Sequence, residues 1–88
     1  MNLEEAFGKV LKKIRYEHSL SQEALGFESG YHRTYISLLE RGEKSPSLNT
    51  IFQLAKALKV LPSEILRLTE SQVIQLRRRD SGGRKKIR

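Results

Sequence analysis

Apolar residues recur at helical spacing through most of the chain, and no segment alternates as a β-strand would. The first stretch, residues 2–18, has apolar positions separated by 4, 3, 1 and 3 residues, which places them on one face of a helix. Asn2 is suited to cap this helix, and Glu4 and Glu5 fall in its first turn, where the helix dipole favours acidic side chains. The apolar face consists of Leu3, Phe7, Val10, Leu11 and Ile14.

Two short helices are expected next. Ser21 can cap a helix that ends at about residue 28, and Gly30 stands where a left-handed residue would end it. The third helix is expected over about residues 33–41. Two short helices joined by a tight turn that contains glycine are the geometry of a helix-turn-helix. The inward positions of the third helix are Ile36 and Leu39.

Residues 43–46 have the composition of a loop, after which Ser47 can cap a fourth helix. Pro62 is a suitable first residue for a fifth helix. Residues 69–72 match a capping box and slightly favour a break near Thr69, with a sixth helix beyond it. The alternative is one longer fifth helix, which fits the apolar positions Leu66, Val73 and Leu76.

The fold class is therefore all-α, a compact domain of five helices with a sixth as the alternative. Residues 1–76 form the expected domain, and they hold ten Lys or Arg and nine Asp or Glu, so the domain is almost neutral. Residues 77–88 hold seven Lys or Arg and one Asp and are expected to be a disordered basic tail. Two interpretations of the tail stay open: a solubilising end, or a nonspecific DNA-binding arm whose affinity depends on salt.

Several function classes have no support in the sequence. The chain has no cysteine and only two histidines, so no metal site or other cofactor is expected. The sequence has neither a nucleophile paired with a base nor a glycine-rich phosphate loop, so nothing in it indicates an enzyme. No apolar run reaches the length of a membrane span, and the N-terminus does not resemble a signal peptide, so we expect no membrane association and a cytoplasmic protein.

Four of the expected helices carry an ordered set of residues: Leu20 to Glu23, Leu25, Gly30, Ile36 and Ser37, Leu39 to Gly42, Pro46 and Ser47, Thr50 and Ile51, Leu54 and Ala55, and Ala57 and Leu58. This set resembles the lambda-repressor-like, or XRE-type, helix-turn-helix DNA-binding domains of bacterial and phage regulators. Within that family, residues 33–37 look most like the controller proteins of restriction–modification systems. His32 departs from the family pattern, which usually has Ser, Thr or Asp there, so a weak start of the third helix is expected.

The resemblance implies that the third helix is a recognition helix whose N-terminal residues meet base edges in the major groove of double-stranded DNA. Arg33 can bind guanine through two hydrogen bonds, and Thr34 can place its methyl group on thymine. Ser37 is the third candidate for a base contact, although a phosphate or sugar contact also suits it. Gln22 resembles the family glutamine that binds a phosphate at a helix N-terminus. The other candidate DNA backbone contacts are Tyr35, Arg41, Lys44, Asn49 and Thr50.

Arg15 and Glu40 match a family pair that forms an internal salt bridge between the first and third helices. Its expected role is to orient the recognition helix, because a buried pair is weak evidence for net stability.

A homodimer is expected, because one recognition helix reads few base pairs and two helices spaced about one DNA turn, ~34 Å, read more. The expected dimer surface lies within residues 62–76, at Ile65, Leu68, Val73, Ile74 and Leu76.

The resulting hypothesis is a sequence-specific transcription regulator that binds a two-fold operator. It would act by occupying its site, by contacting RNA polymerase or through its own concentration, since no small-molecule effector domain is expected. The alternative is a protein-interaction module on the same scaffold, such as an antitoxin or an anti-repressor.

Overall fold

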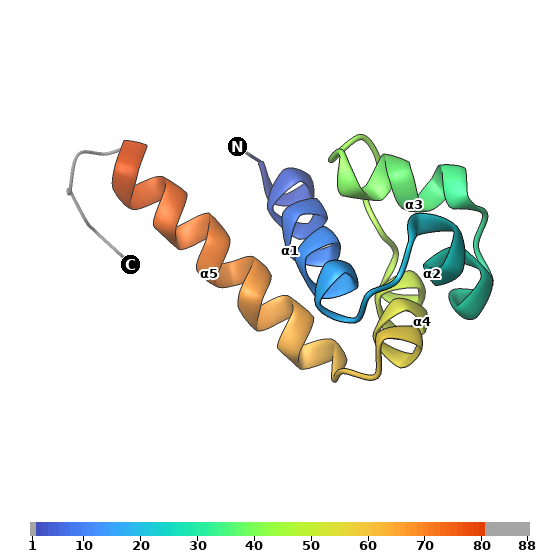
Figure 1. Cartoon of the computed structure of the whole chain (residues 1–88). Helices are drawn as coiled ribbons and strands as arrows, with labels where there is room; N and C mark the ends of the chain where they lie inside the picture. The colour runs from blue at the N-terminus through green and yellow to red at the C-terminus, as the bar shows by residue number, and fades with distance from the viewer. Residues whose placement is uncertain (1, 81–88) are drawn as a thin grey trace.

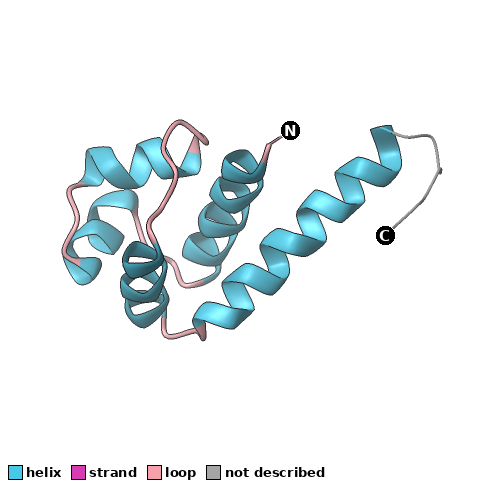
Figure 2. Cartoon of the chain, turned by 180° about the vertical axis from the view of Figure 1, so that it is seen from behind, coloured by secondary structure: helices cyan, strands magenta, loops and turns pink. Residues whose placement is uncertain are grey.

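The computed structural model describes residues 2–80, and for residues 76–80 it describes only the helical backbone. Within that range the chain forms five α-helices joined by short loops (Figure 2). The all-α prediction is confirmed. The helices are α1 (Leu3–Glu17), α2 (Gln22–Ser29), α3 (Arg33–Glu40), α4 (Leu48–Leu58) and α5 (Pro62–Asp80).

The predicted caps fix where the first, second and fourth helices begin. The Asn2 side chain accepts a hydrogen bond from the Glu5 backbone N–H at 2.8 Å, and the Glu5 carboxylate accepts one from the Asn2 N–H at 3.0 Å, which completes a capping box. Ser21 and Ser47 cap α2 and α4 through their hydroxyl oxygens, each of which accepts the backbone N–H three residues later. Helix ends are therefore the part of the fold that local sequence controls most directly.

In the turn between α2 and α3, the glycine behaves as predicted, whereas the histidine has a role that was not predicted. Gly30 has φ 84°, the left-handed conformation that ends α2. His32 caps α3, because its Nδ1 atom accepts the Thr34 backbone N–H at 3.0 Å. The start of α3 is thus capped although Ser, Thr or Asp is absent there, because the imidazole Nδ1 atom supplies the acceptor. The weaker start expected from His32 stays a prediction.

Helix α1 lies between α3 and α5 and contacts both (Figure 1). The core gathers around it, with large side chains from all five helices fully removed from solvent. Each such side chain contributes about 1.5–3 kcal/mol by its burial. These fully buried side chains are Leu11, Leu25, Ile36, Leu39, Leu54, Leu58 and Ile65.

Helix α5 is continuous from Pro62 to Asp80, so the break near Thr69 and the sixth helix are not present in the described chain. The Thr69 hydroxyl donates to the Ile65 carbonyl at 2.8 Å, and Thr69 is buried. Its polar group is therefore satisfied inside the helix and is not needed as a cap. The boundary predicted between residues 76 and 77 falls within α5, and residues 77–80 are helical. Residues 81–88 of the predicted tail lie outside the described residues.

In the described part of the chain, no helix combines the length and apolar character that a membrane crossing requires.

Candidate nucleic-acid interface

Helix α3 is held on α1 by a buried ion pair. The Arg15 Nε atom donates to Glu40 Oε2 at 2.5 Å and its Nη2 atom donates to Glu40 Oε1 at 2.9 Å. Both side chains are almost fully buried, at 6% and 3% exposure. The third nitrogen of Arg15 donates to the Leu20 carbonyl at 2.9 Å. The two-bond geometry fixes distance and angle together, so the pair expected from the resemblance sets how α3 lies on α1.

The charge of Arg15 is secure. The Glu40 carboxylate, which accepts its hydrogen bonds, raises the pKa of Arg15 above its ordinary value, and burial acts in the opposite direction with a smaller effect. Arg15 therefore stays protonated across the pH range in which proteins are studied.

Gln22 joins this network. It is the first residue of α2, and its Nε2 atom donates to Glu40 Oε1 at 3.0 Å. An amide nitrogen carries two hydrogens, so a second one remains for another acceptor. The half-buried Gln22 side chain is thus held at the N-terminus of α2, where the helix dipole also favours an anion.

The start of α4 is held against α3 by a cluster of hydroxyl groups around Thr50. Its Oγ1 atom lies 3.0 Å from the Tyr31 hydroxyl, 3.4 Å from the Tyr35 hydroxyl and 3.0 Å from Ser47 Oγ. Thr50 is only 4% exposed, so the structure replaces its predicted contact with the DNA backbone by an internal role. The physical reason is that the Ser47 cap turns Thr50 inward, where two tyrosines complete its hydrogen bonds.

The outward surface of α3 carries the candidate reading residues. Arg33 and Thr34 are exposed at its start, and Ser37 is half-buried one turn later, whereas Ile36 and Leu39 are fully buried as predicted. Helix periodicity explains this division, because positions 33, 34 and 37 lie on the side opposite positions 36 and 39. Tyr35 is also half-buried and is turned toward α4.

Three further candidates flank α3 from the loop after it and from the first turn of α4. Arg41 and Lys44 are exposed, and Arg41 makes only a surface ion pair with Glu43 at 3.4 Å. Asn49 is exposed in the first turn of α4, next to Thr50, and the hydroxyl cluster therefore keeps it beside α3. Two separate hydrogen-bond networks thus hold the site, one that ties Gln22 to the end of α3 and one that ties the start of α4 to Tyr31 and Tyr35.

The described residues hold no group of three or more His, Cys, Asp or Glu side chains with the proximity that a metal site needs.

The arrangement of α2 and α3 agrees with a comparison to known sequences. Residues 11–65 match the family described as helix-turn-helix, of the XRE type. The chain belongs to this family. The matched segment runs from the middle of α1 to the first turn of α5, so it includes the helix-turn-helix and its buried ion pair.

Several relatives of this XRE-type chain are controller proteins. Control protein C.BamHI of Bacillus amyloliquefaciens is 45% identical over 69 residues, which are 77% of this chain and 85% of the relative. The crystal structure of the restriction–modification controller protein C.AhdI from Aeromonas hydrophila shares 42% identity with a TM-score of 0.69, over 70% of this chain and 94% of that one. The controller protein C.Esp1396I, solved as a tetramer with its natural 35 base-pair operator, shares 28% identity with a TM-score of 0.76, over 84% and 97%.

The expected dimer surface needs a correction at Ile65. This side chain is fully buried in the core of the single chain, because α5 turns it toward the interior, so it is not available to a partner. Leu68 and Val73 are half-buried, and Leu68 packs on the core. Ile74 is 42% exposed, and the side chain of Leu76 lies outside the described residues.

Apolar side chains on α4 and α5, and on the loop between them, are exposed, and apart from Ile74 they were not part of the expected dimer surface. Leu66 lies two turns before Ile74 on α5, and the single residue Glu70 lies between them on that surface. Phe52 lies off the apolar stripe of α4, and this position in the sequence could have identified it as an exposed aromatic side chain. The exposed group consists of Leu48, Phe52, Leu61, Leu66 and Ile74.

Proposed function

We propose that this chain is a sequence-specific DNA-binding transcription regulator that acts as a dimer on a two-fold operator. The observation that carries the proposal is the exposed start of α3, with Arg33 and Thr34, on a helix that a buried ion pair fixes to α1. Rigid presentation of a few polar side chains is what base readout requires. Gln22, Tyr35, Arg41, Lys44 and Asn49 are the proposed backbone contacts, which set register without carrying sequence information.

The relatives support this proposal. C.Esp1396I was solved on its natural operator, and it resembles this chain over most of both lengths. The almost neutral charge of residues 1–76 also favours specific contacts over general attraction to DNA as the source of selectivity. As a DNA-binding regulator the protein would work where the chromosome lies, in the cytoplasm, and it would need no catalytic group or cofactor.

Arg33→Ala is expected to reduce discrimination between the preferred duplex and a duplex changed at one guanine by about 5- to 150-fold, the equivalent of ~1–3 kcal/mol. The reason is that Arg33 is the one α3 side chain that can donate two parallel hydrogen bonds to guanine. The measurement is binding of the full chain to a duplex selected from a random pool and to its single-base variants, at one fixed salt concentration.

Lys56→Ala is the matched control, because Lys56 is an exposed cation near the end of α4, away from α3. It should leave the ranking of duplexes unchanged. A ranking that Arg33→Ala also leaves unchanged would show that Arg33 does not read a base. A selection that yields no preferred sequence would contradict the proposed function itself.

We further propose that the exposed apolar side chains of α4 and α5 form the dimer surface. Leu66 is one of the two members of this surface on α5, at 45% exposure. Leu66→Glu should raise the dimer dissociation constant at least about tenfold, because it removes apolar burial and places a charge against apolar groups. The measurement is sedimentation at micromolar concentration, with and without DNA.

Gln75→Glu adds the same charge at another exposed position of α5 and serves as the control for Leu66→Glu. It should sediment as the unaltered chain does. An unaltered chain that is monomeric under both conditions would rule out the dimer, and a Leu66→Glu dimer of full strength would place the contact elsewhere.

The manner of regulation follows from what the bound dimer touches. A dimer placed over a promoter blocks it, and a dimer placed beside one can contact RNA polymerase directly. We propose polymerase contact as the activating route. Transcription in a purified system, from templates with the operator moved by half and whole DNA turns, separates the two routes, since only direct contact depends on that spacing.

A further inference from the structure

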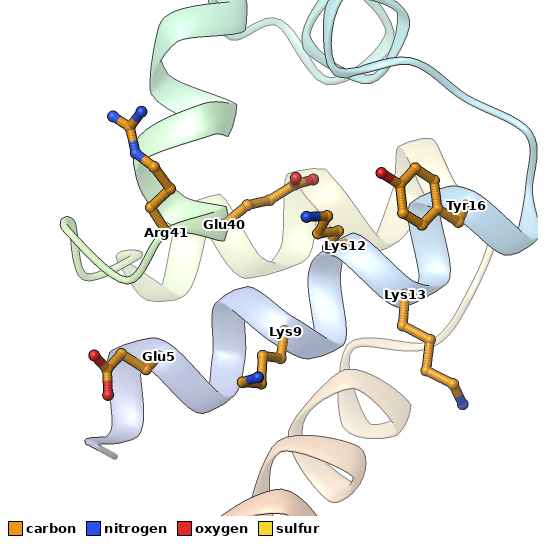
Figure 3. Close-up of a pocket in the computed structure, with 7 residues that line it drawn as sticks. All are labelled: Glu5, Lys9, Lys12, Lys13, Tyr16, Glu40 and Arg41. Carbon is orange, nitrogen blue, oxygen red and sulfur yellow. The ribbon is translucent and has the colours of Figure 1, made fainter.

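A hollow of about 570 Å³ opens between α1 and the C-terminal end of α3 (Figure 3). It lies away from the reading residues at the start of α3, and of the proposed backbone contacts only Arg41 borders it. Its lining consists of Glu5, Lys9, Lys12, Lys13, Tyr16, Glu40 and Arg41.

The α1 side of the hollow follows directly from sequence spacing. One face of α1 carries Lys9 and the residues three, four and seven positions after it, which are Lys12, Lys13 and Tyr16. Lys12 and Tyr16 on that face look toward α3, whose last residue, Glu40, is fixed by Arg15 (Figure 3). The spacing between the two walls is therefore set by the same ion pair that orients α3.

The lining carries more positive charge than its own carboxylates balance. It contains four cationic side chains and two carboxylates, and the Glu40 carboxylate already accepts bonds from Arg15 and Gln22. Lys13 pairs with Glu17 at 3.5 Å. Lys9 and Lys12 have no carboxylate within 4.0 Å among the residues whose side chains are described. In a domain that is almost neutral, this excess is local.

The floor of the hollow is ordered by stacking. The Tyr16 ring lies with the Arg15 guanidinium 4.7 Å from its centroid and the Lys12 ammonium 5.9 Å from it. Figure 3 shows Lys12 and the Tyr16 hydroxyl reaching toward the Glu40 side, whereas Lys13 points away. Two ammonium groups without a carboxylate partner and a phenol thus border one concave space. Arg41 lies at its rim, where its guanidinium pairs with Glu43 at 3.4 Å and points away from α1 (Figure 3).

We propose that this hollow binds a phosphate group, through Lys9 and Lys12 on α1, with the Tyr16 hydroxyl as a further donor. Phosphate is the common anion whose charge and several acceptor oxygens suit two ammonium groups and a hydroxyl donor that border one concave space. The group can belong to DNA that flanks the operator or to a free phosphorylated molecule. The proposal goes beyond the reading of DNA by α3 and does not depend on it.

The first test uses inorganic phosphate and the full chain. Backbone amide NMR signals at Lys9, Lys12, Tyr16 and Arg41 should shift saturably with phosphate at constant ionic strength. Lys9→Gln/Lys12→Gln should abolish these shifts while it keeps helix propensity nearly unchanged. The matched control Lys56→Gln/Lys59→Gln, which neutralises two exposed lysines at the end of α4, should retain them. Arg33→Ala should also retain them, which separates this site from the recognition helix.

The second test uses DNA of increasing flank length around the selected sequence. If flanking DNA supplies the phosphate, the unaltered chain gains affinity as the flanks grow, and Lys9→Gln/Lys12→Gln does not. The double variant should then also lower the slope of log affinity against log salt by ~0.9, the value for one lost phosphate contact. Lys56→Gln/Lys59→Gln should behave as the unaltered chain.

The outcomes are distinct. Phosphate shifts that need Lys9 and Lys12, together with a flank effect, place DNA in the hollow. The same shifts with no flank effect assign a free phosphorylated ligand. If the variant of Lys9 and Lys12 matches the variant of Lys56 and Lys59 in both tests, the hollow does not bind phosphate and the proposal is overturned.

Discussion

Arg15→Met should lower the free energy of unfolding by about 3–5 kcal/mol, because it leaves the Glu40 carboxylate buried at 3% exposure without its cation. A domain of this size has a total stability on the order of 5–15 kcal/mol, so the variant should be near its limit at room temperature. Urea unfolding followed by circular dichroism measures the change, with the slope against urea compared to confirm that the unfolded state is unaltered.

The double variant Arg15→Met/Glu40→Met is the control for this loss. It removes both charges, so it should recover most of the stability, since buried pairs can be replaced by apolar residues of similar size at little cost. DNA affinity should nevertheless stay reduced, because the two-bond link that orients α3 is gone. A double variant with unchanged stability and unchanged DNA binding would show that the pair does not position α3.

The pH dependence of the Arg15 contribution follows from its raised pKa. A base whose pKa is higher in the folded state contributes stability that is complete below its unfolded-state pKa and is lost as pH rises through its folded-state pKa. For Arg15 that window lies at strongly alkaline pH. The difference in stability between the unaltered chain and Arg15→Met should therefore change little between pH 6 and pH 9 on account of Arg15.

Features that depend on a few neighbouring residues could be predicted from the sequence. The caps at Asn2, Ser21 and Ser47 and the left-handed Gly30 involve atoms within three residues of each other, so their residue types nearly determine them. The inward faces of α1 and α3 followed from the 3.6-residue period, except that Leu3, in the first turn of α1, is 62% exposed. The resemblance to the family supplied the one long-range contact, between Arg15 and Glu40.

Features that depend on packing between helices could not be predicted in the same way. Periodicity places Ile65 and Leu66 in the apolar pattern of α5. Only the angle at which α5 crosses α1 decides that Ile65 faces the core and that Leu66 faces solvent. Thr69 shows the same limit, because a capping box and a buried mid-helix threonine share one sequence. Thr50 was assigned to the DNA backbone from the family resemblance, and its partners Tyr31 and Tyr35 could not be inferred because they are distant in the chain.

Gly8 lies in the middle of α1 and was not identified by any sequence signal. In the structure it is buried where α1 crosses the end of α3. A Cβ atom at this position would lie 2.5 Å from the backbone carbonyl oxygens of both Leu39 and Glu40. These are backbone atoms of a packed helix, so they cannot move aside as a flexible side chain would. Gly8 and the ion pair of Arg15 with Glu40 thus fix the same end of α3 on α1.

Gly8→Ala is expected to lower the free energy of unfolding by about 2–3 kcal/mol, toward the upper end of the cost of overpacking. The net loss should appear although alanine favours the helix over glycine by ~1 kcal/mol. At a temperature where Gly8→Ala remains folded, its DNA affinity should also fall, because relief of the clash requires α3 to shift away from α1. Thermal unfolding and duplex binding measure the two effects.

Lys13→Ala is the matched control for Gly8→Ala, since it changes an exposed residue of α1 that makes only a surface ion pair with Glu17. Its stability should stay within about 0.5 kcal/mol of the unaltered chain. If Gly8→Ala were instead more stable than the unaltered chain, the gain in helix propensity would exceed the clash, and α3 would not be seated rigidly on α1. A stable Gly8→Ala that also kept its sequence preference would show that the position of α3 tolerates such a shift. Base readout would then depend on the side chains of α3 more than on the position of α3 against α1.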